Sequence, residues 1–212
     1  MLDLISIILH LDQYVGAVVN IYGLWVYLII FLIIFLETGL VVTPFLPGDS
    51  LIFILGALAA VGALNILWLV VILAAAAIIG DTVNYWIGHH FNRKVLKTGK
   101  IRFVKKEHLD NAYDFYEKHG GKTIIIARFI PFVRTFAPFV AGITHMKYKK
   151  FISYNVIGGV VWTAGFALAG YYLGSIPVVK ENISLVVITI ALSTAVIAVI
   201  TYIGHMVKKQ IE

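Results

Sequence analysis

Long apolar stretches separated by short polar segments dominate the pattern of this 212-residue chain. Stretches at 64–91, 151–173 and 183–206 are each long enough to cross a bilayer core, which takes roughly 20 apolar residues. The last has no formal charge, whereas the first carries Asp81 and Asn84 and the second carries Asn155. We therefore predict three transmembrane helices at these positions.

Two shorter apolar stretches are each broken by a turn with proline and glycine. Residues 24–42 are followed by Thr43-Pro44-Phe45-Leu46-Pro47-Gly48 and then by an apolar run too short for an ordinary span. This pattern favours a re-entrant hairpin over 24–62, shielded by protein at membrane depth. Ala137-Pro138-Phe139-Val140-Ala141-Gly142 aligns with the first turn, which predicts a second hairpin over 123–146 with its first arm at 123–136.

Each hairpin precedes a long span, so we predict an all-α membrane protein, a single membrane domain over 1–212. It would contain two inverted repeats, each a re-entrant helical hairpin plus a transmembrane helix, and an extra C-terminal transmembrane helix at 183–206. Amphipathic patterns predict interfacial helices at 1–22 on the outer surface and at 103–119 on the inner surface. Chance similarity between two Pro-Gly turns is the alternative to a true repeat.

The distribution of basic residues orients these elements. Residues 1–92 contain no Lys or Arg, 93–122 contain nine, and further clusters follow the second hairpin and the last span. Because cytoplasmic loops collect Lys and Arg, we predict an outer N-terminus and a cytoplasmic basic segment (93–122) and C-terminus. The hairpins then enter from opposite faces, as in secondary transporters whose sites lie near the midplane. If residues 24–62 instead crossed the membrane fully and came back, the rest of the chain would have the same orientation.

Composition narrows the function classes. The chain is 60% hydrophobic and only 13% charged, whereas a soluble domain carries about 25% charged residues. With no cysteine, the chain cannot form disulfides, thiol nucleophiles or Cys-based zinc sites. The formal charge of +6 comes from basic residues that flank apolar segments, so we expect anionic lipid headgroups as partners and no nucleic acid.

Formal charges at membrane depth are the candidate functional residues: Glu37, Asp49, Asp81, Arg128 and Arg134. Each would cost roughly 2.5–3.5 kcal/mol if unpaired, so these side chains must pair, be hydrated or perform a function. One interpretation is a salt bridge between Glu37 and Arg134 that locks the hairpins together. The other is that the arginines bind a phosphate bidentately while Glu37 or Asp49 takes up a proton.

Several of these positions also have plain structural interpretations. Asp49 follows Pro47-Gly48 and would also serve as a helix N-cap. Asp81 would also belong to a polar face packed on another helix, and we expect Asn155 and Trp162 to be packing or hydrogen-bond partners. No histidine sits beside the arginines in sequence, so we expect no enzyme, no metal site and no cofactor.

Motifs over residues 35–165 occur in a specific order: Phe35-Leu36-Glu37-Thr38-Gly39, Pro44, Pro47-Gly48-Asp49-Ser50, Gly80-Asp81, Tyr85, Gly88, Arg128-Phe129-Ile130-Pro131, Arg134, Pro138, Ala141-Gly142, Met146, Phe151, Asn155, Gly158 and Trp162. This set resembles the DedA family of membrane proteins, also called the SNARE-associated or VTT-domain family. The resemblance implies a bacterial-type plasma-membrane protein with opposed re-entrant hairpins. The acids and arginines on which the family relies match Glu37, Asp49, Arg128 and Arg134. Position 49 is often Glu in the family, and the shorter Asp49 favours capping over titration.

The resemblance also implies function. Family members are linked to moving lipids between leaflets, including undecaprenyl phosphate and phosphatidylethanolamine, and others to proton-dependent transport and to drug or pH tolerance. We therefore expect a transporter of an anionic or phosphate-bearing lipid. A proton-coupled antiporter for small cations or drugs, with structural arginines, and a non-transporting membrane scaffold are the alternatives. The lipid, the direction, the energy coupling and the oligomeric state are left open.

Overall fold

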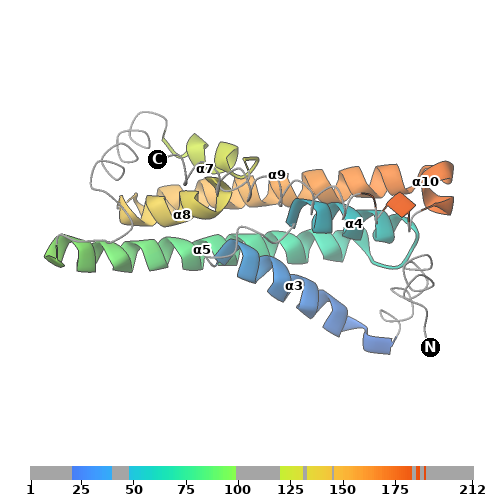
Figure 1. Cartoon of the computed structure of the whole chain (residues 1–212), viewed down its shortest axis with the longest axis horizontal. Coiled ribbons are helices and arrows are strands. Elements are labelled where there is room, and N and C mark those ends of the chain that lie inside the picture. Colours follow the sequence, from blue (N-terminus) through green and yellow to red (C-terminus); the bar gives the residue numbers. More distant parts are fainter. Residues whose placement is uncertain are drawn as a thin grey trace, which may run out of the picture. The chain divides into compact units, whose positions relative to one another are not determined.

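The computed structural model describes residues 21–39, 48–98, 120–130, 133–144, 146–182, 185–186 and 189, and within these ranges every regular element is a helix. The helices are α3 (Leu24–Gly39), α4 (Gly48–Ala60), α5 (Ile66–Thr98), α7 (Lys122–Ala127), α8 (Val133–Ile143), α9 (Tyr148–Gly174) and α10 (Pro177–Glu181) (Figure 1). The all-α class is confirmed for the described part of the chain. The predicted interfacial helix at 103–119, nearly all of the predicted helix at 1–22 and most of the predicted span at 183–206 lie outside it.

Two helices are long and apolar enough to cross a membrane, and they lie at the predicted spans 64–91 and 151–173. These are Ile66–His90, within α5, and Tyr148–Gly174, the whole of α9, with mean hydropathies of 2.4 and 1.5. Asn65 sets the start of α5, because its Oδ1 accepts hydrogen bonds from the amides of Leu67 (3.0 Å) and Trp68 (3.2 Å), as a helix N-cap does. The helix α3 and the helices α4 and α8 are apolar but shorter than a full span.

The chain forms two compact units. Unit 1 comprises Met1–Tyr27, Phe45–Leu69 and Gly165–Glu212, and unit 2 comprises Leu28–Pro44 and Val70–Ala164. The helices α3, α5 and α9 each contribute one end to unit 1 and the other end to unit 2.

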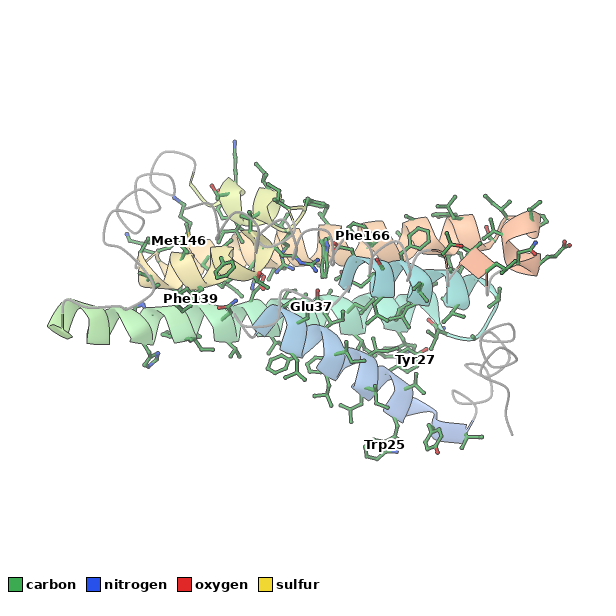
Figure 2. All side chains as sticks on the ribbon, viewed as in Figure 1. Trp25, Tyr27, Glu37, Phe139, Met146 and Phe166 are labelled. Carbon is green, nitrogen blue, oxygen red and sulfur yellow. The ribbon has the colours of Figure 1, made fainter. Side chains whose placement is uncertain are left out.

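Within unit 1, α4 packs closely against the end of α9 through glycines. A Cβ added at Gly56 would overlap the carbonyl oxygen of Ala167, and one added at Gly170 would overlap the carbonyl oxygen of Phe53. The helix α4 ends at Ala60, and Gly62 just beyond it has a φ of +87°, the left-handed conformation of a glycine that terminates a helix. Trp25 and Tyr27, at the start of α3, also belong to unit 1 (Figure 2).

Within unit 2, α8 packs against α5 in the same way. A Cβ at Gly88 would overlap the carbonyl oxygen of Phe139, and a Cβ at Gly142 would overlap that of Tyr85. Tyr85 also stacks on Phe151, with ring centroids 4.5 Å apart, and donates a hydrogen bond of 2.5 Å to the carbonyl of Met146. These contacts join α5, α8 and α9 into the framework that carries the polar residues.

The break in the second predicted hairpin lies at a different place from the predicted one. Residues 137–142 are helical, with Pro138 inside α8, whereas α7 ends at Ala127 and α8 begins at Val133. This corrects the predicted first arm at 123–136. The reason is Pro131, which disfavours helical backbone at Ile130. Pro138 is tolerated because helices inside a membrane protein can satisfy the freed backbone groups through neighbours.

The re-entrant hairpins and the inverted repeats remain predictions. The turn of the first hairpin, with Pro44 and Pro47, lies outside the described residues. The orientation of the chain in the membrane, which rests on the basic segment at 93–122, also remains a prediction.

Candidate functional site

A glycine contact in unit 2 places the end of α3 directly on α5. A Cβ added at Gly80 would overlap the Thr38 hydroxyl oxygen and would lie 3.0 Å from the Phe35 carbonyl oxygen. Only a residue without a side chain allows this approach. It brings Glu37, at the end of α3 (Figure 2), into the same pocket as Asp81, the residue after Gly80. Both carboxylates are buried, with exposed fractions of 2% and 4%.

Two ion pairs connect these acids to the arginines that flank the break between α7 and α8. Nη2 of Arg134 donates to Oε1 of Glu37 at 2.5 Å, and Nη2 of Arg128 donates to Oδ2 of Asp81. The structure therefore contains the predicted pair of Glu37 and Arg134, and it gives Arg128 a partner that the sequence did not assign. Pairing removes much of the cost of burying charges away from water.

Two fully buried asparagines organise the surroundings of the ion pairs. Asn155 Oδ1 accepts a second hydrogen bond from Nη2 of Arg128, while its own Nδ2 donates to the Ile78 carbonyl at 3.0 Å. The amide of Asn84 donates to the carbonyls of Thr38 (3.2 Å) and Thr135 (2.7 Å).

Those two threonines follow Glu37 and Arg134 in sequence, so Asn84 fixes the backbone on both sides of that ion pair. The sequence analysis did not single out Asn84 as a site residue. The available signal was an amide in an apolar span three residues after Asp81, which places both side chains on the same helical face.

The helix α9 supplies an aromatic wall and the space for one arginine. The ring of Trp162, which is buried, faces both guanidiniums, with its centroid 5.9 Å from Cζ of Arg128 and 5.2 Å from Cζ of Arg134. Such contacts are favourable cation–π interactions, more so when water is excluded. Gly158 leaves room for Arg128, because a Cβ there would lie 3.1 Å from Cδ of that side chain. Trp162 is thus part of the site as well as of the packing.

The charged side chains and Trp162 line one pocket. It is lined by Glu37, Thr38, Asp81, Arg128, Arg134, Thr135 and Trp162, and its free volume is about 10 Å³. That is room for roughly one water molecule, so a larger polar group can enter only if one of the lining side chains gives way. With all four charged groups ionised, the two acids balance the two arginines.

The remaining predicted site residues have other positions. Asp49 lies in the first turn of α4, in unit 1, and its role stays a prediction. Gly48 is the first residue of that helix, whereas Pro47 lies outside the described residues. Pro138 and Gly142 are buried in α8, where Gly142 permits the contact with α5.

Comparison with known proteins identifies the family. A family model described as the VTT domain matches residues 46–172. Protein DedA of Escherichia coli strain K12 is 52% identical over 204 residues, which cover 95% of this chain and 93% of that protein. This chain belongs to the DedA family. Two further relatives in the same strain are the inner membrane protein YghB, 36% identical with 80% of each chain covered, and the inner membrane protein YqjA, 34% identical with 72% and 69% covered.

Two of these relatives are named as inner membrane proteins, and this chain has two helices long enough to span a membrane. The chain is therefore a membrane protein of the DedA family. The VTT match includes Asp81 and both arginines of the pocket, whereas Glu37 precedes it. No solved structure gives a significant match to the chain.

Proposed function

We propose that this protein moves a phosphate-bearing lipid between the leaflets of the membrane, with the lipid headgroup bound in the pocket. The observation that carries the proposal is that Arg128 and Arg134 line one pocket in a membrane-embedded chain. A guanidinium matches the oxygens of a phosphate bidentately, and two of them beside a buried aromatic wall form a binding site for such a group. Undecaprenyl phosphate and phosphatidylethanolamine both carry the required phosphate.

The surroundings of the arginines suit a lipid better than a free anion. Side chains next to them in sequence are apolar and exposed by 44–50%: Phe129, Ile130, Val133 and Phe136. Apolar side chains exposed on a membrane protein face the hydrocarbon, where the chains of a bound lipid would lie. The pocket would therefore hold the headgroup while the hydrophobic chains stay in the bilayer.

The acid Glu37 supplies a route to proton coupling. A phosphate that binds Arg134 takes the place of the Glu37 carboxylate, which is buried and would lose its ion pair with Arg134. Losing an ion pair raises the cost of a buried carboxylate, so Glu37 would take up a proton in that state and release it when the headgroup leaves. No bond in the lipid breaks in this cycle, so the protein acts as a transporter and not as an enzyme.

Leaflet exchange in reconstituted vesicles tests the proposal. Vesicles containing a labelled polyprenyl phosphate or labelled phosphatidylethanolamine are compared with and without purified protein. We expect the protein to accelerate exchange of at least one of these lipids, which is then recovered chemically unchanged. The double variant Glu37→Gln/Arg134→Gln removes a whole buried ion pair, so it should fold but not accelerate exchange. Exchange no faster than in protein-free vesicles for both lipids would contradict the proposal.

A matched control checks that reconstitution itself is not limiting. In Gly165→Ala, the added Cβ meets no atom within 4 Å, and the position lies on α9 outside the pocket lining. This variant should exchange lipid as the unmodified protein does. A loss of exchange in the control would point to the handling of the protein and not to the pocket.

A further inference from the structure

The two arginines of the pocket are held in different ways. Arg128 is deeply buried, and its Nη2 donates to both Asp81 and Asn155. Asn155 is itself oriented by its hydrogen bond to the Ile78 carbonyl, and Asp81 is as buried as its partner, with both side chains 5% exposed. The Arg128 side chain also lies against Gly158 of α9, where an added Cβ would be only 3.1 Å from its Cδ.

Arg128 has donors left for a ligand in this arrangement. A guanidinium carries five N–H donors. Both hydrogen bonds of Arg128 come from Nη2, and its buried Nε has no hydrogen-bond partner among the residues that the structure describes. Arg128 can therefore donate to a phosphate from its other nitrogens without leaving Asp81.

Arg134 is the more accessible of the two. Its side chain is 14% exposed, compared with 5% for Arg128, and its Nη2 points at Oε1 of Glu37 from 2.5 Å. Asn84 donates hydrogen bonds to the backbone carbonyls of Thr38 and Thr135 next to this pair, so the backbone is held in place there. A carboxylate oxygen at that distance occupies the position that a phosphate oxygen would take.

We propose that Arg128 is a fixed anchor for the headgroup, positioned by Asp81 and Asn155, whereas Arg134 exchanges its partner between Glu37 and the headgroup. This inference rests on the proposed function and assigns separate roles within it. Asp81 and Asn155 are positioning residues that act through Arg128, and Glu37 is a competitor that the headgroup must displace. The two acids should therefore affect binding in opposite directions.

Binding of a short-chain prenyl phosphate to the purified full-length protein in detergent tests this difference in sign. Glu37→Gln removes the competitor and should bind the probe about tenfold more tightly or better, as expected for freeing one hydrogen-bonding charged group, while leaflet exchange slows because release is impeded. Asp81→Asn removes the fixed partner of Arg128 and should bind the probe at least about tenfold more weakly.

Two further variants separate positioning from folding. Asp81→Asn/Arg128→Gln removes the buried pair as a whole, so it should recover a thermal midpoint near that of the unmodified protein but not its affinity for the probe. Asn155→Ser removes the second acceptor of Arg128 without leaving an unpaired charge. It should weaken binding several-fold, and it replaces Asp81→Asn in the comparison if that variant does not fold.

The outcomes are distinguishable. The assignment of roles is wrong if Asp81→Asn/Arg128→Gln binds the probe as tightly as the unmodified protein. It is also wrong if the variant at Glu37 and the variant at Asp81 or Asn155 change affinity in the same direction. The transport proposal stands in either case. If the unmodified protein neither binds the probe nor exchanges lipid, the proposed function itself fails. Opposite shifts in affinity with a recovered midpoint in the double variant support the assignment.

Discussion

Substituting Gly80 by alanine should disturb the site through packing alone, because this glycine sets the distance between α3 and α5. The new Cβ would overlap the Thr38 hydroxyl and lie 3.0 Å from the Phe35 carbonyl oxygen and 3.1 Å from the Gly39 amide nitrogen. The threonine hydroxyl can rotate, but the two backbone atoms can separate from the Cβ only if the end of α3 moves. Such overpacking costs about 1–3 kcal/mol, whereas alanine in a helix gains about 1 kcal/mol over glycine.

The expected net result of Gly80→Ala is a loss of roughly 0–2 kcal/mol in stability, with a larger proportional loss of leaflet exchange because Glu37 is carried by the displaced end of α3. Thermal unfolding in detergent and vesicle exchange measure the two effects. Gly165→Ala is the matched control, since its Cβ meets nothing within 4 Å and should leave exchange unchanged. Equal midpoints and equal exchange rates for the two variants would refute the reasoning.

Three further substitutions test separate parts of the account. Arg134→Lys keeps a positive charge beside Glu37 but loses the planar, bidentate donor. The thermal midpoint should therefore stay close to that of the unmodified protein, while exchange in vesicles falls about tenfold; full exchange would favour a structural arginine. Asn84→Leu removes two hydrogen bonds that hold the ends of α3 and α8, and thermal unfolding should show a loss of about 1–3 kcal/mol; no loss would mean that those bonds are replaced. Asn65→Ala removes the cap of α5, which should cost about 1 kcal/mol and speed amide hydrogen exchange in the first turn without affecting lipid exchange.

The positions of the long helices and of the buried charges could be predicted from the sequence. A continuous apolar pattern of span length has few alternatives to a helix, and α5 and α9 lie where it predicts. The cost of an isolated charge in such a segment also required partners for Glu37, Asp81 and Arg134. The ion pair of Glu37 with Arg134 is the case in which charge, depth and order along the chain sufficed.

The partner of Arg128 could not be predicted in the same way. It depends on the rotation of α5 about its axis and on the exact residue at which α7 ends, neither of which a hydrophobic pattern specifies. Asp81 and Asn84 share one face of α5, yet Asp81 meets Arg128 while Asn84 meets two backbone carbonyls. Every residue carries a backbone carbonyl, so the sequence does not show which carbonyl a side chain will bond to. The role of Asn84 could therefore be found only in the structure.

The break between α7 and α8 shows how local similarity can mislead. Residues 137–142 match the turn at 43–48 in residue type, but a proline in the middle of a helix can be accommodated, and Pro138 is. The competing signal was Pro131, which follows Arg128 closely and restricts the residue before it. The consequence for the site is that the arginines flank the break itself: Arg128 directly follows α7, and Arg134 lies in the first turn of α8.

Native mass spectrometry of gently purified protein tests most directly whether the pocket holds a lipid phosphate. The unmodified protein should retain a phosphate-bearing lipid from the membrane, and Glu37→Gln/Arg134→Gln, which removes both members of one ion pair, should lose most of it. If both proteins keep the same lipid in equal amounts, the headgroup does not bind between these side chains and the proposed transport site is wrong.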